Sequence, residues 1–402
     1  MKILLLSTSS FSGSGKATYK ISKCLENEKI NYSYKNLINN KENISIKEKF
    51  TQKLYTLKLK TNSIICKIFG KDIKDFQSLS LFNTNLSKII NQSDYDIVHL
   101  TCVNEFLSIE DIGKIKKPIV WTLCDMWPIA GVSHYDKYHS SIYWSKDSFY
   151  HSKYNLDKWI INRKIKSWKN NINFVAPSQW LYDCSKKSVV SYKHNINKIP
   201  WPIDTNLFKK LDKKIVRKYY KLPLDRKIIL FNSFSGIYNK RKGWDLFIKA
   251  INKIDIDFDI MVIGNGSNKN IENQVTKKIH WMGITKNDED LVKMINCGDL
   301  LVLPSRMDNL PQTGMEAQAC GLPVVAFNSN GIKDLINHKI DGYLAEPYDS
   351  DSLGIGIKWV IKKIQESTEI IDNCINKSKK DWDIKKIGKV YRKLYTDILS
   401  RN

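Results

Sequence analysis

Short apolar runs alternate with longer segments of mixed polarity along most of the chain. A continuous apolar run of strand length is typical of a strand buried on both faces, and helix-length segments between such runs are typical of parallel βα units. The pattern therefore predicts an α/β fold built on parallel sheets. The predicted strands are Ile3–Ser7, Ile97–Leu100, Ile119–Leu123, Phe174–Ala176, Ile228–Phe231, Ile260–Gly264, Leu300–Leu303 and Val324–Phe327.

The predicted strands form two series, one in each half of the chain. Between them lies Ile199-Pro200-Trp201-Pro202-Ile203-Asp204, where two prolines predict a hinge. At roughly 150 residues per domain, a chain of this length is also too long for a single core. We therefore predict two doubly wound, Rossmann-like domains that face a cleft. Ligands of such sheets bind beyond the carboxyl ends of the strands, so the loops there are the places to look for chemistry.

The end of the chain predicts one more element. Residues 385–399 carry apolar side chains at helical spacing and predict a closing amphipathic helix. The apolar positions are Ile387, Val390, Leu394 and Ile398.

The distribution of apolar residues and cysteines narrows the class of protein. No apolar run is long enough for a membrane-spanning helix, which needs about 18 residues. The opening run stops at Ser7, too early for a signal peptide, so we expect a buried strand there. The eight cysteines are scattered without a CxxC pair. This favours reduced thiols in a cytoplasmic protein over a disulfide framework or a zinc site.

The formal net charge of +24 comes from 58 lysines and only seven arginines. Proteins that read nucleic acid rely on arginine for bidentate contacts, so we expect no nucleic-acid partner. Two interpretations of the charge stay open: a solvated surface, or attraction to an anionic membrane or a phosphate-bearing substrate.

Two segments combine lysines with apolar residues at helical spacing, Lys47–Phe69 and Leu156–Lys169. We favour contact with a membrane or a lipid acceptor for the first segment. For the second, an ordinary helix facing the core is at least as good an interpretation.

The stretch FSGSGKAT (11–18) follows the first predicted strand. It lacks the first glycine and the hydroxyl of an ATPase phosphate loop, where Ser10 and Ala17 stand, and the third glycine of a dinucleotide fingerprint, where Thr18 stands. What remains is a Gly13-Ser14-Gly15 turn, which lets backbone amides approach a ligand at a helix N-terminus. The alternative is a flexible βα turn without a ligand.

Two acids flank a turn in DNLPQTGMEAQACGLPVV (308–325). Asp308 and Asn309 follow a predicted strand, so we expect them to project into the cleft, where a carboxylate can accept hydrogen bonds from sugar hydroxyls. Thr313 to Glu316 read as a capping box that starts a helix ended by Gly321. Glu316 is therefore either a helix cap or a ligand of a bound molecule. Elsewhere, Asp255, Asp257 and Asp259 predict the surface of an edge strand and no metal site.

Several stretches together resemble the group-1 (family 4) retaining glycosyltransferases of the GT-B fold, and among them those of bacterial surface polysaccharides. PSRMDNLPQTGMEAQACGLPVV (304–325) resembles the family's acid–x7–acid donor motif, and NKRKGWDLFIKAI (239–251) resembles its phosphate-binding turn and helix. The resemblance covers nearly the whole chain. The other matching stretches are DIVHL (96–100), IVWTLCDMWPIAG (119–131), APSQWLYDCSKKS (176–188), PIDTNLF (202–208), VIGNG (262–266) and MGI (282–284).

The resemblance implies a domain plan and a reaction. Residues 1–200 would bind the acceptor, residues 201–380 would bind the nucleotide-sugar donor, and residues 381–402 would form a helix that packs back toward the first domain. The enzyme would move a hexosyl-type sugar from a UDP- or GDP-linked donor to a glycan or lipid-linked acceptor, without a cofactor or metal. The place would be the cytoplasm, at the inner face of the membrane, in lipopolysaccharide or capsule synthesis.

The resemblance also implies roles for individual residues. The sugar would lie at Asp308, the diphosphate over the helix start, and the ribose at Glu316, while Arg241 and Lys242 would stabilise the charge that grows on the leaving diphosphate. Asp125, Lys242, Arg241 and Asp308 are the expected catalytic residues. The expected donor-binding residues are Gly13, Ser14, Gly15, Gly264, Gly266, Ile284, Asn309, Leu310, Gln312, Thr313 and Glu316.

The chain departs from the family pattern at two places. Cys124 stands where relatives commonly carry His, so Asp125 or His134 would have to take over its contact, or activity would be reduced. An Arg expected near Gly236 is absent, and Arg241 would substitute for it. These departures keep open an alternative, a catalytically weak GT-B partner or scaffold in a glycan-assembly complex.

Overall fold

The computed structural model describes residues 1–10, 13–38, 46–71, 76–135, 144–151, 154–233, 237–264, 266, 269–285 and 287–401, without the side chains of 46–50, 233 and 269–270. It forms two compact units. The first contains Met1–Pro202 together with Ile384–Asn402, and the second contains Ile203–Asp383. Phe11, Ser12, Gly236, Asn265 and the side chain of Phe50 thus lie outside the described part.

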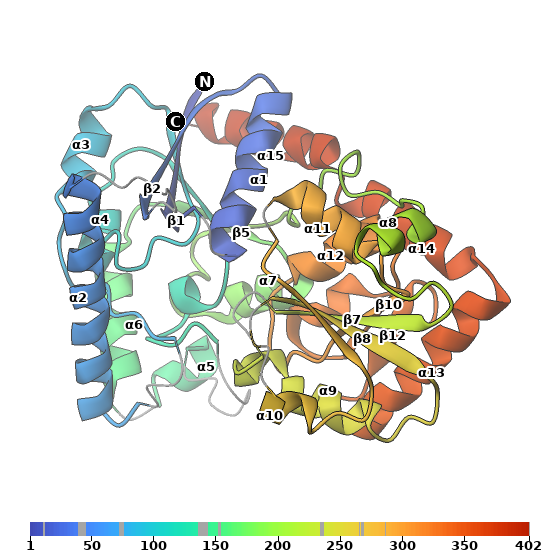
Figure 1. Cartoon of the computed structure of the whole chain (residues 1–402). Helices are drawn as coiled ribbons and strands as arrows, with labels where there is room; N and C mark the ends of the chain where they lie inside the picture. The colour runs from blue at the N-terminus through green and yellow to red at the C-terminus, as the bar shows by residue number, and fades with distance from the viewer. Residues whose placement is uncertain are drawn as a thin grey trace. The chain divides into compact units, whose positions relative to one another are not determined.

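The first unit is built on a parallel sheet, six-stranded in the described part of the chain, with the order β2-β1-β3-β4-β5-β6. Helices pack around the sheet (Figure 1). The strands are β1 (Lys2–Ser9), β2 (Asn31–Ile38), β3 (Ile97–Leu100), β4 (Ile119–Thr122), β5 (Ile172–Ala176) and β6 (Asn195–Lys198). The helices are α1 (Gly13–Asn27), α2 (Ile46–Ile68), α3 (Leu86–Gln92), α4 (Ile109–Gly113), the 3-10 helix η1 (Trp127–Ile129), α5 (Lys146–Phe149), α6 (Leu156–Ser167), α7 (Gln179–Lys187) and α15 (Ile384–Leu399).

The second unit repeats this plan. Within the described residues its parallel sheet also has six strands, in the order β12-β11-β10-β7-β8-β9. The strands are β7 (Lys227–Ser233), β8 (Phe258–Gly264), β9 (Ile279–Gly283), β10 (Leu300–Leu303), β11 (Val324–Phe327) and β12 (Gly342–Ala345). The helices are α8 (Lys213–Tyr219), η2 (Lys240–Lys242), α9 (Trp244–Ile251), α10 (Lys269–Glu272), α11 (Asp288–Ile295), α12 (Gln312–Ala319), η3 (Asn330–Leu335), α13 (Ser350–Glu366) and α14 (Glu369–Asp381).

All eight strands predicted from apolar runs are confirmed, because each carries a continuous buried run such as Leu300–Leu303. The strands that the pattern missed are β2, β6, β9 and β12. Most of them carry partly exposed polar residues, as in NYSYKNLI of β2 and NINK of β6, so they lack a continuous apolar run. A strand at the edge of a sheet is not required to be apolar on both faces.

Each sheet has one place where the strand order reverses. In the first unit the chain builds β2 on one side of β1 and then crosses over to β3 on the other. In the second unit it builds β8 and β9 on one side of β7 and then crosses over to β10. Ligands of doubly wound sheets bind beyond the carboxyl ends of the strands at such a switch point.

The C-terminal helix α15 belongs to the first unit and lies beside α1 (Figure 1). The prediction of its buried face was wrong at one position, since Val390 is exposed. Tyr391 and Tyr395 complete the face instead. Their hydroxyls reach polar groups of the sheet: Tyr395 Oη lies 2.6 Å from His99 Nδ1, and Tyr391 Oη lies 3.1 Å from Thr122 Oγ1.

Helix α6 resolves the alternatives that the sequence left open for 156–169. Ile160 and Ile161 are fully buried, and so is Lys164, whose ammonium group donates to the carbonyl oxygens of Trp127, Ala130 (2.8 Å) and Gly131 (3.2 Å). Helix α6 is therefore a helix that faces the core.

The structure also tests the predictions for the cysteines and for Asp259. All eight cysteines lie in the described part of the chain, and each is a free thiol, most of them buried. The prediction that Asp259 lies on the surface was wrong. Its carboxylate is buried in β8, where it pairs with Arg226 Nε (2.7 Å) and His280 Nε2 (2.7 Å). The charges compensate one another, which permits a carboxylate inside the sheet.

Candidate functional site

The site of the second unit is built at the switch point between β7 and β10. These strands are parallel neighbours, so the turn Asn239–Gly243, which comes after β7, lies against the loop Pro304–Pro311, which comes after β10. Gly243 has a φ of 73°, and a β-carbon there would stand 1.8 Å from the carbonyl oxygen of Pro304. Only glycine therefore lets the basic turn approach the loop so closely.

The approach creates a cluster of three charges. Lys242 Nζ lies 2.7 Å from Asp308 Oδ2, and Arg241 Nη1 lies 3.2 Å from the same oxygen. Arg241 Nη1 also donates to the carbonyl oxygen of Met307 at 2.7 Å. Two cations against one carboxylate leave an excess of one positive charge.

The cluster is largely withdrawn from water, with 13% of the Asp308 side chain and 21% of the Lys242 side chain exposed. Burial alone would raise the pKa of Asp308, but the charges of Lys242 and Arg241 outweigh it and lower that pKa to about 2. For Lys242, burial lowers the pKa, opposed by the attraction of Asp308.

Arg306 fixes this arrangement, and sequence reasoning missed it. Its guanidinium pairs with Asp245 of α9 (2.6 Å) and donates to the carbonyl oxygen of Lys240 (2.6 Å), while its backbone amide donates to the carbonyl oxygen of Arg241 (2.8 Å). The available signal was an arginine two residues before Asp308 in the matched motif. Arg306 is a positioning residue for the basic turn.

Helix α12 begins beside this cluster. The predicted capping box was wrong: Pro311 is the N-cap without a side-chain hydrogen bond, and Thr313 lies inside the first turn. The amides of Gly314 and Met315 bond to the carbonyl oxygen of Pro311, which starts the helix before Thr313. The N-terminus of a helix carries a partial positive charge and accommodates anions. Gln312 and Thr313 stand at this end.

Glu316 is not a helix cap, because it lies in the second turn of α12, and it is 5% exposed. At Gly314 of the same helix, a β-carbon would stand 2.3 Å from Leu335 Cδ2. Asn309 and Leu310 are buried at 2% and 4% exposure, so they shape the loop from inside. Gly321 has a φ of 76° just after the helix, as a C-terminal glycine should.

Gly264 ends β8 and Gly266 follows it, and β8 is the neighbour of β7 in the sheet. Gly264 and Gly266 have φ values of 128° and 132°, which only glycine adopts readily. A β-carbon at Gly266 would stand 2.6 Å from Ile237 Cγ1. Ile284, which follows β9, is half-exposed and lies one strand farther from Asp308. Gly264 and Gly266 are thus one strand nearer to the charge cluster than Ile284 is, because β8 lies between β7 and β9.

In the first unit, Gly13–Gly15 form the first residues of α1, which follows β1 at the β1/β3 switch point. The two glycines differ: a β-carbon at Gly15 would stand 2.2 Å from the carbonyl oxygen of Ser9, whereas one at Gly13 would have open space. Thr18 Oγ1 donates to the carbonyl oxygen of Ser14 at 2.8 Å and lies 2.7 Å from Thr101 Oγ1. Gly15 is therefore required by packing of α1 on β1, and Gly13 is the position with room for a ligand.

The loop after β4 contains the departure from the family pattern. Asp125 Oδ2 lies 2.6 Å from His134 Nδ1, and Asp125 Oδ1 accepts from the amide of Trp127 at 2.9 Å. His134 is buried, and its other ring nitrogen lies 2.9 Å from Ser78 Oγ. Both nitrogens of His134 are thus engaged inside the unit. Burial raises the pKa of the Cys124 thiol.

The described residues contain neither a candidate metal site nor a helix that could span a membrane. Among the described residues, no group of three or more His, Cys, Asp or Glu side chains is placed to hold a metal ion. Over the same residues, no helix is long and apolar enough to cross a membrane.

The charge cluster lies in the part of the chain that matches a family model. The model of the group 1 glycosyl transferases matches residues 212–380, which include the basic turn, the 304–311 loop and α12. An uncharacterized glycosyltransferase of Methanocaldococcus jannaschii is 33% identical over 172 residues, which are 41% of this chain and 48% of the relative. The chain therefore spans about half the length of that curated relative.

Two further similarities cover more of the chain. The UDP-Gal:alpha-D-GlcNAc-diphosphoundecaprenol alpha-1,3-galactosyltransferase of Escherichia coli is 23% identical over 342 residues, which are 81% of each protein. The crystal structure of Anabaena HepE in complex with UDP has a TM-score of 0.63 at 16% identity, and covers 99% of this chain and 100% of HepE. Together with the two sheets, this similarity shows that the fold is GT-B.

Proposed function

We propose that the chain is a retaining glycosyltransferase, because residues 212–380 match the model of the group 1 glycosyl transferases and the fold is GT-B. It takes a sugar from a nucleoside diphosphate sugar and moves it to a glycan or lipid-linked acceptor. The observation that carries this proposal is the cluster of Lys242, Arg241 and Asp308 at the switch point of the second unit, next to the start of α12.

The excess positive charge of this cluster supports our proposal that it binds the diphosphate of the donor. One positive charge remains in excess, and the N-terminus of α12 adds a partial one, so the place suits a diphosphate. When the sugar leaves, negative charge grows on the diphosphate oxygen, and Lys242 and Arg241 stabilise that charge more than the ground state. HepE binds UDP in its crystal structure, which supports a uridine nucleotide as the donor.

The remaining donor contacts are proposed from the matched motif. Asp308 accepts hydrogen bonds from sugar hydroxyls, and Glu316 accepts them from the ribose. Gly13, with open space at the position of a β-carbon, lets a backbone amide of the first unit approach a ligand.

We propose that the first unit binds the acceptor. A carboxylate oxygen accepts more than one hydrogen bond. Asp125 keeps 16% of its side chain exposed and is our candidate for holding an acceptor hydroxyl. The Escherichia coli relative is named for a lipid-linked diphosphate acceptor, which supports an acceptor of that class. We further propose a role in lipopolysaccharide or capsule synthesis at the inner face of the cell membrane.

Thermal unfolding with a panel of nucleotides and nucleotide sugars tests the donor proposal. A ligand at about 100 times its Kd should raise the free energy of unfolding by about 2.7 kcal/mol. We expect stabilisation by UDP or GDP and by one of their sugars, and slow release of the nucleoside diphosphate without acceptor. If no nucleotide stabilises the protein, the proposed function is wrong.

Two finer parts of the proposal have their own measurements. The anomeric configuration of the product, followed by NMR, should match that of the donor if the reaction is retaining. Turnover should be unchanged after treatment with EDTA if no metal takes part.

A catalytically weak partner or scaffold is the second candidate. It is favoured by the loop after β4, where Cys124 replaces the family His and both oxygens of Asp125 are engaged within the unit. Nucleotide binding without any release of nucleoside diphosphate, over all donors and acceptors tried, would support this candidate.

A further inference from the structure

Helix α2 leaves several large aliphatic side chains exposed, which is unusual for a helix that packs on a core. Its inner side carries the buried Asn62 and Cys66 together with the partly buried Ile65, which packs against the core. Its outer side carries Leu57, Ile64 and Ile68, which are 59%, 60% and 75% exposed. A helix that packs on a core normally turns its large aliphatic side chains inward.

Polar contacts hold the inner side of α2. Lys58 Nζ donates to the carbonyl oxygen of Glu105 at 3.3 Å. Glu105 is in turn fixed to Ser80, since its carboxylate accepts from the Ser80 amide (2.9 Å) and its own amide donates to Ser80 Oγ (3.1 Å). Lys58 and the core contact of Ile65 thus both attach the helix to its unit.

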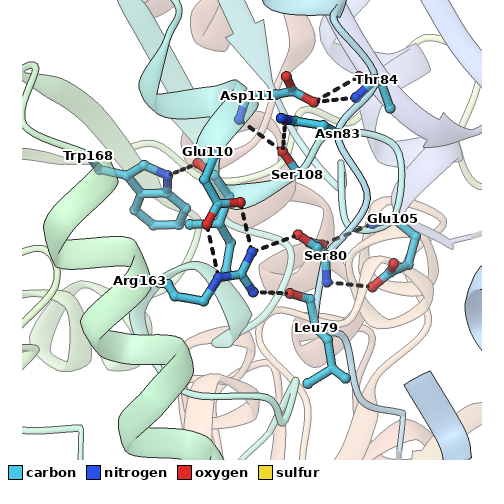
Figure 2. Close-up of polar contacts among 11 residues, drawn as sticks. Leu79, Ser80, Asn83, Thr84, Glu105, Ser108, Glu110, Asp111, Arg163 and Trp168 are labelled. Atoms are coloured by element: carbon cyan, nitrogen blue, oxygen red, sulfur yellow. Dashed lines mark hydrogen bonds and ion pairs between the residues drawn. The ribbon is translucent and has the colours of Figure 1, made fainter. Parts of the chain in front are cut away.

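Ser80, which holds Glu105, is part of a larger polar network. Figure 2 shows Arg163 reaching from α6 to make two bonds with the carboxylate of Glu110 (2.9 and 2.7 Å) and to donate to the carbonyl oxygens of Leu79 (3.0 Å) and Ser80 (3.3 Å). A rotation that turned the aliphatic side chains of α2 inward would have to give up the contact of Lys58 with this region.

Basic residues share the outer face with the aliphatic ones. At 3.6 residues per turn, Lys53, Leu57, Lys60, Ile64, Lys67 and Ile68 fall within a stripe of about 100°. All six are exposed, and no acidic residue occurs between Thr51 and Gly70. We call these six residues the outer stripe. A hollow of about 500 Å³ lies along it, lined by Gln52, Lys53, Thr56, Leu57 and Lys60.

Composition alone does not produce such a stripe, as α6 shows. Helix α6 has the same mixture of isoleucine and lysine, yet Ile160 and Ile161 are buried in the core. In α2, Leu57, Ile64 and Ile68 are exposed to water beside the ammonium groups of exposed lysines. A surface that is apolar in depth and anionic at its boundary satisfies both kinds of side chain, and an anionic lipid bilayer has this structure.

We propose that the outer stripe of α2 docks on an anionic bilayer, with the helix lying in the plane of the membrane. Leu57, Ile64 and Ile68 enter the boundary between headgroups and acyl chains, and Lys53, Lys60 and Lys67 extend to the lipid phosphates. The inference deepens the proposed function and rests on it, because a protein held at the membrane meets lipid-linked acceptors there.

Sedimentation with vesicles tests the docking. The full chain is mixed with vesicles of phosphatidylcholine containing about a third of phosphatidylglycerol, and with vesicles of phosphatidylcholine alone. Each lysine near an anionic surface contributes about 1 kcal/mol, so the triple change Lys53→Gln, Lys60→Gln, Lys67→Gln should weaken binding on the order of 100-fold. The change Leu57→Ser, Ile64→Ser, Ile68→Ser should weaken it about tenfold or more.

Matched controls remove the same charge and the same apolar surface elsewhere. For charge, Lys379→Gln, Lys389→Gln and Lys393→Gln alter three exposed lysines of α14 and α15. For apolar surface, Ile215→Ser, Ile340→Ser and Ile355→Ser alter three exposed isoleucines of the second unit. Both controls should bind anionic vesicles within a few-fold of wild type.

The outcomes are distinct. Binding that is equal on neutral vesicles, absent altogether, or lost as much in the controls as in the α2 variants overturns the proposal. So does a concentration-dependent dimer in sedimentation velocity that the Leu57, Ile64 and Ile68 changes abolish, since the stripe would then bind a second copy. Stabilisation by UDP or GDP, measured on every variant, separates the two proposals: its absence in wild type refutes the donor site and leaves the vesicle result standing.

Discussion

Asp308 and Asp125 each follow a buried strand of a parallel sheet, yet their surroundings differ. Asp308 comes after β10, one of the two strands at the switch point of its sheet. Asp125 comes after β4, one strand beyond the β1/β3 switch point of the other sheet. The loop that carries Asp308 meets the turn after the neighbouring strand β7, whereas the loop after β4 is folded against its own unit.

Their partners follow from this difference. Asp308 is held by Arg241 and Lys242, which lie 66 residues or more away in the sequence and leave positive charge in excess. Asp125 is held by Trp127 and His134 of its own loop. A carboxylate after a strand thus predicts a site only together with its place in the strand order. The following predictions test how far the difference extends to function.

The largest effect is expected at Glu316, the second acid on the Asp308 side. If Glu316 binds both ribose hydroxyls, Glu316→Ala loses two charge-assisted hydrogen bonds, on the order of 1,000-fold in donor affinity. The measurement is UDP or GDP binding by calorimetry, with circular dichroism to establish folding. Wild-type affinity in the folded variant would show that Glu316 is only a buried residue of α12.

Lys242→Ala should lower turnover on the order of 100-fold with a smaller change in donor affinity, because the charge acts on the leaving diphosphate. Lys249→Ala is the matched control, since Lys249 is an exposed lysine at the end of α9, away from Asp308. Equal turnover of the two variants would remove Lys242 from the chemistry.

Asp308→Ala should cost about 3 kcal/mol of stability, because it leaves the mostly buried Lys242 without its closest counter-ion. The double variant with Lys242→Ala should recover part of this loss. The pKa of Asp308 is about 2 in the folded protein, below its ordinary 3.8, so the wild-type gain is present above about pH 4 and disappears as the pH falls toward 2. Urea unfolding at pH 7 and pH 3 measures both; a difference between wild type and variant that does not shrink at pH 3 contradicts the assignment.

Asp125→Ala should lower the free energy of unfolding by about 1 kcal/mol through its two lost hydrogen bonds. If Asp125 also holds an acceptor hydroxyl, turnover per folded molecule should fall about tenfold. Asp125→Asn, which can still accept from the Trp127 amide, should keep more of the stability than of the turnover. Full turnover in folded Asp125→Ala would leave Asp125 as an anchor of its loop.

The smallest effect is expected at Cys124. Cys124→His restores a hydrogen-bond donor of the family type, so transfer should be preserved or rise by a few-fold. Cys124→Ser is the control for loss of the thiol alone. A large drop in transfer for the His variant, with folding intact, would show that the loop after β4 has been reorganised around the cysteine.

Much of the fold could be predicted because strands buried on both faces leave a local signal. Leu300–Leu303 and Val324–Phe327 are legible as continuous apolar runs without knowledge of their neighbours. Within the candidate site, Asp308, Lys242 and Gly243 could be identified from motif and strand position. Arg306 could not be given a role, because its function depends on Asp245 and on the carbonyl oxygen of Lys240, which approach it only in the folded chain.

The sequence by itself determined the buried parallel strands, the loops after them and the family motif, since these depend on residues close together in the chain. Only the tertiary structure decided which loops meet, because β7 and β10 become neighbours through a crossover that no local pattern records. It also decided which side of a mixed helix faces inward. In α6, Ile160 and Ile161 are buried, and Lys164 donates to three carbonyl oxygens inside the unit. In α2, Leu57, Ile64 and Ile68 are exposed, and Lys58 donates to the carbonyl oxygen of Glu105 on the inner side of the helix.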